Sequence, residues 1–226
     1  MSIWSIRSMV SAAYARRSNI AAFTACALAV AGCSGSGASK DDFVIRPIPS
    51  FEATNQLSQS LFQQQTGVEK TQLARLPDVG TATYLGAAAY VTSSEALVDK
   101  KYPEYEQTII NDPEYVSEVR LVADFASDSV SGNFYSFRDS ENRAYRIDIE
   151  LEGGTIGTSD FGDDAVFGGT LSGTNVQGSE SLNFTGSIAG QFLGARGDMI
   201  LGSVGFIDGF TGKGSPIVGV FTAEQP

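Results

Sequence analysis

The residue types that most often carry catalysis are scarce in this chain. Its 226 residues contain no histidine and only two cysteines, Cys26 and Cys33, both near the N-terminus. Without histidine there is no Ser-His-Asp or Cys-His catalysis, and the commonest metal ligand is missing. No cysteine after Cys33 can supply a thiolate nucleophile or a zinc-thiolate ligand. We therefore expect a non-enzymatic protein without a metal centre or a cofactor.

One run of carboxylates is dense enough to be considered as a ligand site. Segment 160–164 reads Asp-Phe-Gly-Asp-Asp and sets three acidic side chains around a turn, and oxygen ligands of this kind suit calcium. The run lacks the twelve-residue spacing and closing glutamate of a calcium-binding EF-hand loop. Glycosidase chemistry needs a second acid opposite the first, and the pattern places none there. We favour a β-hairpin turn.

Two tyrosines, Tyr102 and Tyr105, are the ligand-binding candidates. They lie in the longest segment of the strand-rich region that we expect to be irregular, Ser93 to Pro113. Long loops on rigid scaffolds often bind partners, tyrosine is a favoured contact residue, and it can coordinate haem iron. The alternative is a solvated connector whose tyrosines pack on the rim of the fold. The sequence leaves both interpretations open.

The charge balance excludes one class of partner. Acidic residues outnumber basic ones 26 to 15, which gives a formal net charge of −11. A negative chain repels phosphate backbones, so we expect no nucleic-acid binding.

Residues 1–32 have the pattern of a secretory signal peptide. Arg7, Arg16 and Arg17 form a basic start, and an apolar run over 20–30 follows, which is too short to span a bilayer. Removal of this segment takes away three arginines and no acidic residue, which leaves a formal charge of −14.

The end of that segment is more specific. Val-Ala-Gly-Cys at 30–33 resembles the bacterial lipobox, in which the cysteine receives diacylglycerol and becomes the mature N-terminus. The Gly/Ser-rich run 34–40 is typical of a linker behind such an anchor. Ser34 stands where lipoproteins retained in the inner membrane of many Gram-negative bacteria carry Asp. We expect an outer-membrane lipoprotein acylated at Cys33; the alternative is an ordinary signal peptide that contains a cysteine.

An arm precedes the strands, and with the linker it spans 33–75. Asn55 is a candidate cap for a short helix, with Leu57, Leu61 and Phe62 on one side and Gly67 at its end. Such a helix would pack on the outside or the rim of the domain that follows. A mostly irregular leader is the alternative.

From Val79 onward the apolar residues recur with a period of two. Between Tyr145 and Glu152 the alternation is complete, with Tyr145, Ile147, Ile149 and Leu151 facing inward and charged residues between them. Turn residues such as those at 139–142 separate the strands. The expected strands are 79–92, 116–125, 129–138, 145–152, 165–173, 182–194, 198–207 and 216–223.

Eight such strands predict an all-β fold, an eight-stranded antiparallel soluble β-barrel preceded by a signal peptide and a short, partly helical arm. A transmembrane barrel requires an apolar outer face. The outward row Arg146, Asp148, Glu150 and Glu152 is charged.

Four motifs in order resemble the β-barrel domain of transferrin-binding protein B-like lipoproteins, over residues 76–226. The first reads L-P-D-V-G-T-A-T-Y-L-G at 76–86, and the second is A-D-F at 123–125 followed by V-S-G at 130–132. The third begins with F-L-G at 192–194 and continues through Asp198, Ile200 and Gly202, and the last is G-V-F-T-A at 219–223. Family members usually have Ala at position 197, Gly at 201 and 222 and Lys at 224, and this chain departs from all four.

The resemblance implies a binding module that works at the bacterial surface. Transferrin-binding proteins of this type have two lobes, each with a barrel and a handle domain, whereas this chain has one barrel. We therefore expect an outer-membrane lipoprotein on the periplasmic or surface-exposed face, whose barrel binds an iron carrier, haem, a host protein or an outer-membrane receptor. The alternative is a structural or adhesive envelope lipoprotein with no small ligand.

Overall fold

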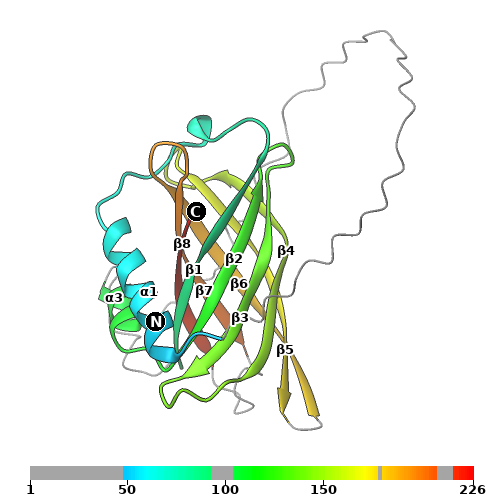
Figure 1. Ribbon diagram of the computed structural model, residues 1–226. Coiled ribbons are helices and arrows are strands. Elements are labelled where there is room, and N and C mark those ends of the chain that lie inside the picture. Colours follow the sequence, from blue (N-terminus) through cyan, green and yellow to red (C-terminus); the bar gives the residue numbers. More distant parts are fainter. Residues whose placement is uncertain (1–47, 93–103, 178–179, 208–215) are drawn as a thin grey trace, which may run out of the picture. The chain divides into compact units, whose positions relative to one another are not determined.

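Eight antiparallel strands follow one another around a closed barrel, in the order β1 to β8 (Figure 1). The computed structural model describes residues 48–92, 104–177, 180–207 and 216–226. Pairing of β1 with both β2 and β8 closes the sheet. The strands are β1 (Thr81–Thr92), β2 (Tyr115–Asp124), β3 (Ser129–Asp139), β4 (Arg146–Thr158), β5 (Ala165–Gln177), β6 (Glu180–Leu193), β7 (Met199–Ile207) and β8 (Ile217–Glu224).

The period-two pattern is confirmed clearly on β4, whereas on β1 and β8 most residues of both faces are buried. On β4, Ile147, Ile149 and Leu151 are buried, while the charged residues between them are exposed. The fold class is therefore the expected one, an all-β barrel of eight antiparallel strands.

Aromatic rings fill the barrel interior. They form a chain of neighbours with ring centroids 5.5–6.5 Å apart, which includes Phe134 against Phe221 at 5.8 Å and Phe184 against Phe206 at 5.5 Å. The largest fully buried side chains include Tyr84, Tyr90, Phe134, Phe137, Phe192, Phe206 and Phe221.

Glycines make room for these rings. Five rings lie directly across from a glycine on the neighbouring strand, and a Cβ at each of these glycines would lie 2.4 Å or less from a ring atom. The many glycines in 173–219 therefore leave space for the aromatic rings of the interior. Because each ring needs a glycine opposite it, these pairs also favour one register of the strands. The pairs are Gly173–Phe184, Gly186–Phe206, Gly190–Phe167, Gly202–Phe221 and Gly219–Tyr90.

Helix α1 (Phe51–Gln65) confirms a helical arm but corrects its details. It begins at the N-cap Ser50, whose Oγ accepts a hydrogen bond from Ala53 N–H, so the expectation that Asn55 caps the helix is wrong. Because the helix already begins at Phe51, Asn55 lies inside it rather than at its N-terminus. The helix buries Leu61, as expected, but Leu57 is 44% exposed. The helix ends just before Gly67, which has a φ of +80°.

Helix α1 lies on the outside of the barrel, over β1 and β8, together with α3 (Glu104–Asn111) (Figure 1). Ile109 and Ile110 of α3 pack against Ala89 and Val220 in a second apolar cluster. β1 is therefore buried on both faces. The expectation of an irregular segment through Pro113 is wrong over 104–111, because this short amphipathic helix covers the sheet there.

A single-turn helix, η2 (Leu73–Arg75), follows α1. None of the helices in the described part of the chain is long and apolar enough to cross a membrane.

Candidate functional site

The two ends of the barrel differ in the length of their connections. Because consecutive strands are antiparallel, β1–β2, β3–β4, β5–β6 and β7–β8 connect at one end. We call this the loop end; its connections are 93–114, 140–145, 178–179 and 208–216. The opposite turn end has the connections 125–128, 159–164 and 194–198, together with 66–80, which leads into β1, and the C-terminal residues.

Backbone hydrogen bonds close the turn end. Thr71 N–H donates to Phe192 O at 2.9 Å, Ala165 N–H donates to Thr71 O at 2.7 Å, and Leu73 N–H donates to Asp163 O at 2.8 Å. Leu76 from the same segment is buried in the interior cluster. The segment 69–76 therefore lies across this end of the barrel and binds to it.

A buried tyrosine also stabilises the turn end through a hydrogen bond. The Tyr84 hydroxyl donates to Gly197 O at 2.6 Å, and the Gln225 side chain lies 3.3 Å from both atoms. Burial raises the pKa of Tyr84 to about 12; the hydrogen bond from Gln225 opposes this shift, and the charge of Asp198 adds to it. The phenol therefore stays neutral and serves as a hydrogen-bond donor.

Two surface depressions, of about 280 and 290 Å³, lie beside this closure. Both are open to solvent and share Pro77 and Phe125 in their walls. Phe125 also belongs to the interior cluster, so the depressions border the turn-end side of the interior, and both are too open to enclose a small ligand.

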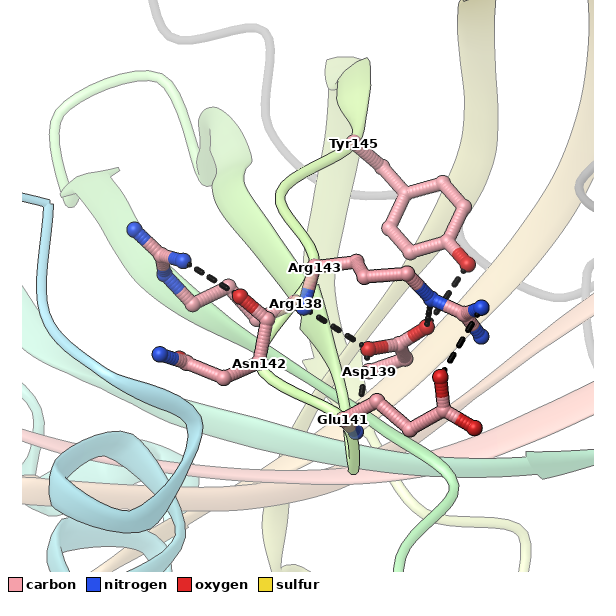
Figure 2. A network of polar contacts seen from close by, with 6 residues as sticks. All are labelled: Arg138, Asp139, Glu141, Asn142, Arg143 and Tyr145. Atoms are coloured by element: carbon pink, nitrogen blue, oxygen red, sulfur yellow. Dashed lines mark hydrogen bonds and ion pairs between the residues drawn. The ribbon is translucent and has the colours of Figure 1, made fainter.

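The β3–β4 turn at the loop end carries the most developed polar network (Figure 2). The buried Asp139 carboxylate accepts four hydrogen bonds. Oδ1 accepts from the backbone N–H groups of Glu141 and Arg143, at 3.1 and 2.9 Å. Oδ2 accepts from Arg143 Nε at 2.6 Å and from the Tyr145 hydroxyl at 2.8 Å. One side chain thus organises the whole turn.

These bonds also set the ionisation of the carboxylate. Burial alone raises the pKa of Asp139, but the hydrogen bonds from Arg143 and Tyr145 and the guanidinium charge outweigh it and lower the pKa below its usual value. Asp139 is thus held as a carboxylate, and its role is structural.

The outer part of the network faces solvent. Arg143 Nη1 lies 2.9 Å from Glu141 Oε2, and their side chains are 63% and 70% exposed. Tyr145 packs edge-to-face on Tyr115, with ring centroids 5.8 Å apart. This surface, which comprises Tyr115, Glu141, Arg143 and Tyr145, offers charge-assisted and aromatic contacts on a rigid turn. We call it the loop-end surface.

The structure places one of the two candidate tyrosines. Tyr105 lies on α3, partly buried against the outer apolar cluster, and burial raises its pKa to about 12. Iron coordination by tyrosine uses the phenolate, which this environment disfavours. Tyr105 therefore fits the alternative interpretation, a tyrosine packed on the barrel. Tyr102 and the acylation candidate Cys33 lie outside the described residues.

The acidic run is a hairpin turn. Thr158 of β4 pairs with Ala165 of β5, and the residues between them form the connection. Asp164 is 3.5 Å from Lys70 Nζ, and Phe161 is 93% exposed. Within the ranges that the structure describes, no group of three or more acidic residues has the geometry to hold a metal ion.

Sequence reasoning recognised 139–142 as a turn but not the network around it. Arg143, Tyr145 and Tyr115 come together only through the turn and the β2–β3 pairing, in which Tyr115 lies opposite Asp139. An Asp at the first position of the turn was the available signal, since its carboxylate often bonds to backbone N–H groups further along.

The fold and the site define a closed eight-stranded barrel with a filled interior, a sealed turn end and an exposed polar surface at the loop end. The family model for the C-lobe and N-lobe β-barrels of Tf-binding protein B matches residues 76–225. The chain belongs to this family.

Several solved structures are similar at low identity. Transferrin binding protein B from Haemophilus parasuis Hp5 is 17% identical, with a TM-score of 0.39, over 70% of this chain and 29% of that one. The isotype 1 protein from serogroup B Neisseria meningitidis is 16% identical, with a TM-score of 0.40, over 70% and 28%. A surface lipoprotein is 16% identical, with a TM-score of 0.36, over 69% and 65%.

This chain therefore spans less than a third of the length of the two transferrin-binding proteins. A search of curated proteins gives no match.

Proposed function

We propose that this chain is a non-enzymatic outer-membrane lipoprotein, anchored by acylation of Cys33, whose barrel binds a protein partner on its outer surface. The observation that carries the proposal is membership of a binding-protein barrel family together with an interior filled by aromatic side chains. Aromatic side chains of the described strands pack against one another in the interior, which supports recognition on the surface rather than of haem or another small ligand inside the barrel. The candidate partners are a host protein, including an iron carrier, and an outer-membrane receptor.

The loop-end surface is the proposed contact region. Its Tyr, Arg and Glu side chains are held by the Asp139 network, so little side-chain entropy is lost when they bind. Tyrosine and arginine are also the residues that most often dominate protein interfaces.

The anchor is tested with two cysteine variants. Cys33→Ser should abolish palmitate labelling and move the protein out of the membrane fraction. Cys26→Ser, within the apolar run of the signal peptide, is the matched control and should change neither. Unchanged labelling in Cys33→Ser would refute the anchor.

Binding is tested with the purified mature chain, which should capture a partner from serum or from envelope extracts of iron-starved cells. Tyr115→Ala should weaken capture at least about tenfold. Phe161→Ala, which removes an exposed aromatic ring at the opposite end of the barrel, should leave capture unchanged. Equal losses in both variants would contradict the proposed surface.

A second function, a structural or adhesive envelope lipoprotein, is favoured by the same packed interior. It predicts no captured partner under any growth condition and an envelope defect on deletion of the gene.

A further inference from the structure

Helix α1 is bound to the barrel much less firmly than the segment that follows it. Three hydrogen bonds join α1 to the rest of the described chain, and each uses a side chain. Phe51 N–H donates to Asn142 Oδ1 at 3.0 Å, Gln59 Nε2 to Ile110 O at 3.3 Å and Gln65 Nε2 to Ala223 O at 3.2 Å. By contrast, 69–73 pairs with the barrel through backbone hydrogen bonds.

The buried face of α1 is largely polar. Its buried residues are Thr54, Ser58, Leu61 and Gln65, so Leu61 is the single large apolar side chain among them. Ser58 Oγ and Gln65 Oε1 are buried and have no hydrogen-bond partner among the described residues. Burial of a polar atom without a partner opposes docking of the helix.

The barrel surface beneath α1 also has small side chains and a buried hydroxyl without a partner among the described residues. The outward-facing Ala87 and Thr222 are fully buried where α1 covers β1 and β8, and Thr222 Oγ1 also has no partner in the described chain. Alanine and threonine bury little apolar area, so the hydrophobic gain from docking rests mainly on Leu61 and on Phe62, which packs against the outer apolar cluster.

Helix α1 begins near the loop end of the barrel, and the chain runs from its last turn toward the turn end (Figure 1). Phe51 contacts Asn142 in the β3–β4 turn at the loop end, whereas Gln65 leads into the segment bound across the turn end. The residues before α1 therefore join the barrel at the loop end only while α1 is docked. If α1 is released, the first fixed point becomes Glu69, whose C=O accepts a hydrogen bond from Gly194 N–H at 2.9 Å at the turn end.

We propose that α1 is a releasable strap that determines which end of the barrel is tethered to the membrane. With α1 docked, the described chain begins at the loop end, so an anchor at Cys33 would hold the loop-end surface near the bilayer. Release moves the attachment point to the turn end and lengthens the linker by about 22 Å of helix. The loop end can then face away from the membrane. The tethering consequence rests on the proposed anchor at Cys33, whereas the release itself does not.

Release is tested by hydrogen exchange on the mature chain carrying Cys33→Ser, which needs no lipid. Amides of α1 should exchange at least about a hundredfold faster than those of β5 and β6, through an opening that leaves the barrel closed. Leu61→Ala should speed exchange of α1 at least about tenfold and leave the strands unchanged. A single common exchange rate for helix and strands, or equal acceleration of both by Leu61→Ala, would overturn the strap.

Two serines of α1 test whether its buried polar face weakens docking of the helix. Ser58→Ala and Ser60→Ala change helix propensity equally, but Ser58 is fully buried and Ser60 is exposed. Ser58→Ala should slow exchange of α1 several-fold more than Ser60→Ala does. Equal effects of the two variants would count against the polar interface as the cause of weak docking.

The tethering consequence is tested with single tryptophans, since the only natural one, Trp4, lies in the signal segment. A maleimide lipid coupled to Cys33 attaches the mature chain to vesicles that contain dansyl lipid, independently of acylation in the cell. Energy transfer should be stronger from Glu141→Trp than from Phe161→Trp, and Leu61→Ala should reduce or reverse that order. An order that Leu61→Ala leaves unchanged would overturn the consequence even if the helix opens.

Discussion

At the scale of single residues, Asp139 stabilises the β3–β4 turn more than any neighbour in the network. Its carboxylate joins the backbone of the turn, a guanidinium and a phenol (Figure 2). Since the folded protein lowers the pKa of this group, the carboxylate stabilises the fold fully above its unfolded pKa of about 3.9. That stabilisation is lost as the pH falls through the lower, folded pKa.

Asp139→Asn tests this linkage. The amide keeps the size of the side chain but loses the charge and one acceptor oxygen, so we expect a loss of about 1–3 kcal/mol in the free energy of unfolding near neutral pH. The difference from wild type should shrink below about pH 4. Urea titrations at both pH values measure it, with the exposed Asp148→Asn on β4 as control. A difference that does not depend on pH would contradict the assigned ionisation.

Gly202 and Gly205 on β7 form a second residue-scale test. A Cβ at Gly202 would lie 2.3 Å from Ala189 O and 2.4 Å from Phe221 Cζ, whereas a Cβ at Gly205 meets nothing within 4 Å. Gly202→Ala should destabilise the barrel by at least about 2 kcal/mol. Gly205→Ala should stay within about 1 kcal/mol of wild type, towards greater stability. Thermal or urea unfolding measures both, and similar values would refute the role given to the glycine–ring pairs.

At the scale of elements, the alternation of apolar and polar residues predicts a strand well where one face of the sheet is exposed to solvent. β4 fits because Asp148 and Glu150 remain exposed beside buried Ile147 and Ile149. β1 loses the alternation, since every residue from Ala87 to Tyr90 is buried between the interior rings and the outer helices. The helix α3 was not predicted because its apolar pair Ile109–Ile110 is too short to show a helical period.

The cap of α1 gives the element-scale prediction. Ser50→Ala removes the hydrogen bond from Ala53 N–H and should weaken the helix by about 1 kcal/mol. Asn55→Ala should not weaken it, because Asn55 Oδ1 is buried with no partner in the described ranges and alanine is the better helix former. Amide exchange over 51–65 measures both. Faster exchange in Asn55→Ala than in Ser50→Ala would restore Asn55 as the cap.

At the scale of the whole molecule, the glycine–ring pairs show which part of the fold could not be predicted from the sequence, namely the contacts inside the barrel. The density of glycine over 186–219 indicates strands, but which ring lies against which glycine depends on the register across four strand pairs. The same limit applies to the loop-end surface, where Tyr115 and Tyr145 are thirty positions apart in sequence. Local sequence patterns thus predict the strands and helices. The side-chain contacts inside the barrel and on its surface form only when the strands pair around the closed sheet.

The packed interior leads to a final prediction. Phe134 and Phe221 are both fully buried and stack edge-to-face at 5.8 Å, so removal of one ring should leave a dry cavity that the closed turn end keeps from solvent. Phe134→Ala should cost about 3–5 kcal/mol and create a site for benzene or xenon, while the wild-type barrel should bind neither. Thermal unfolding with and without benzene measures this, because a ligand that binds only the native state raises the melting temperature. Phe161→Ala, at an exposed turn, is the matched control and should behave as wild type. Stabilisation of the wild-type protein by benzene would mean that the interior already has room for a small ligand, and recognition inside the barrel would then replace recognition on its surface.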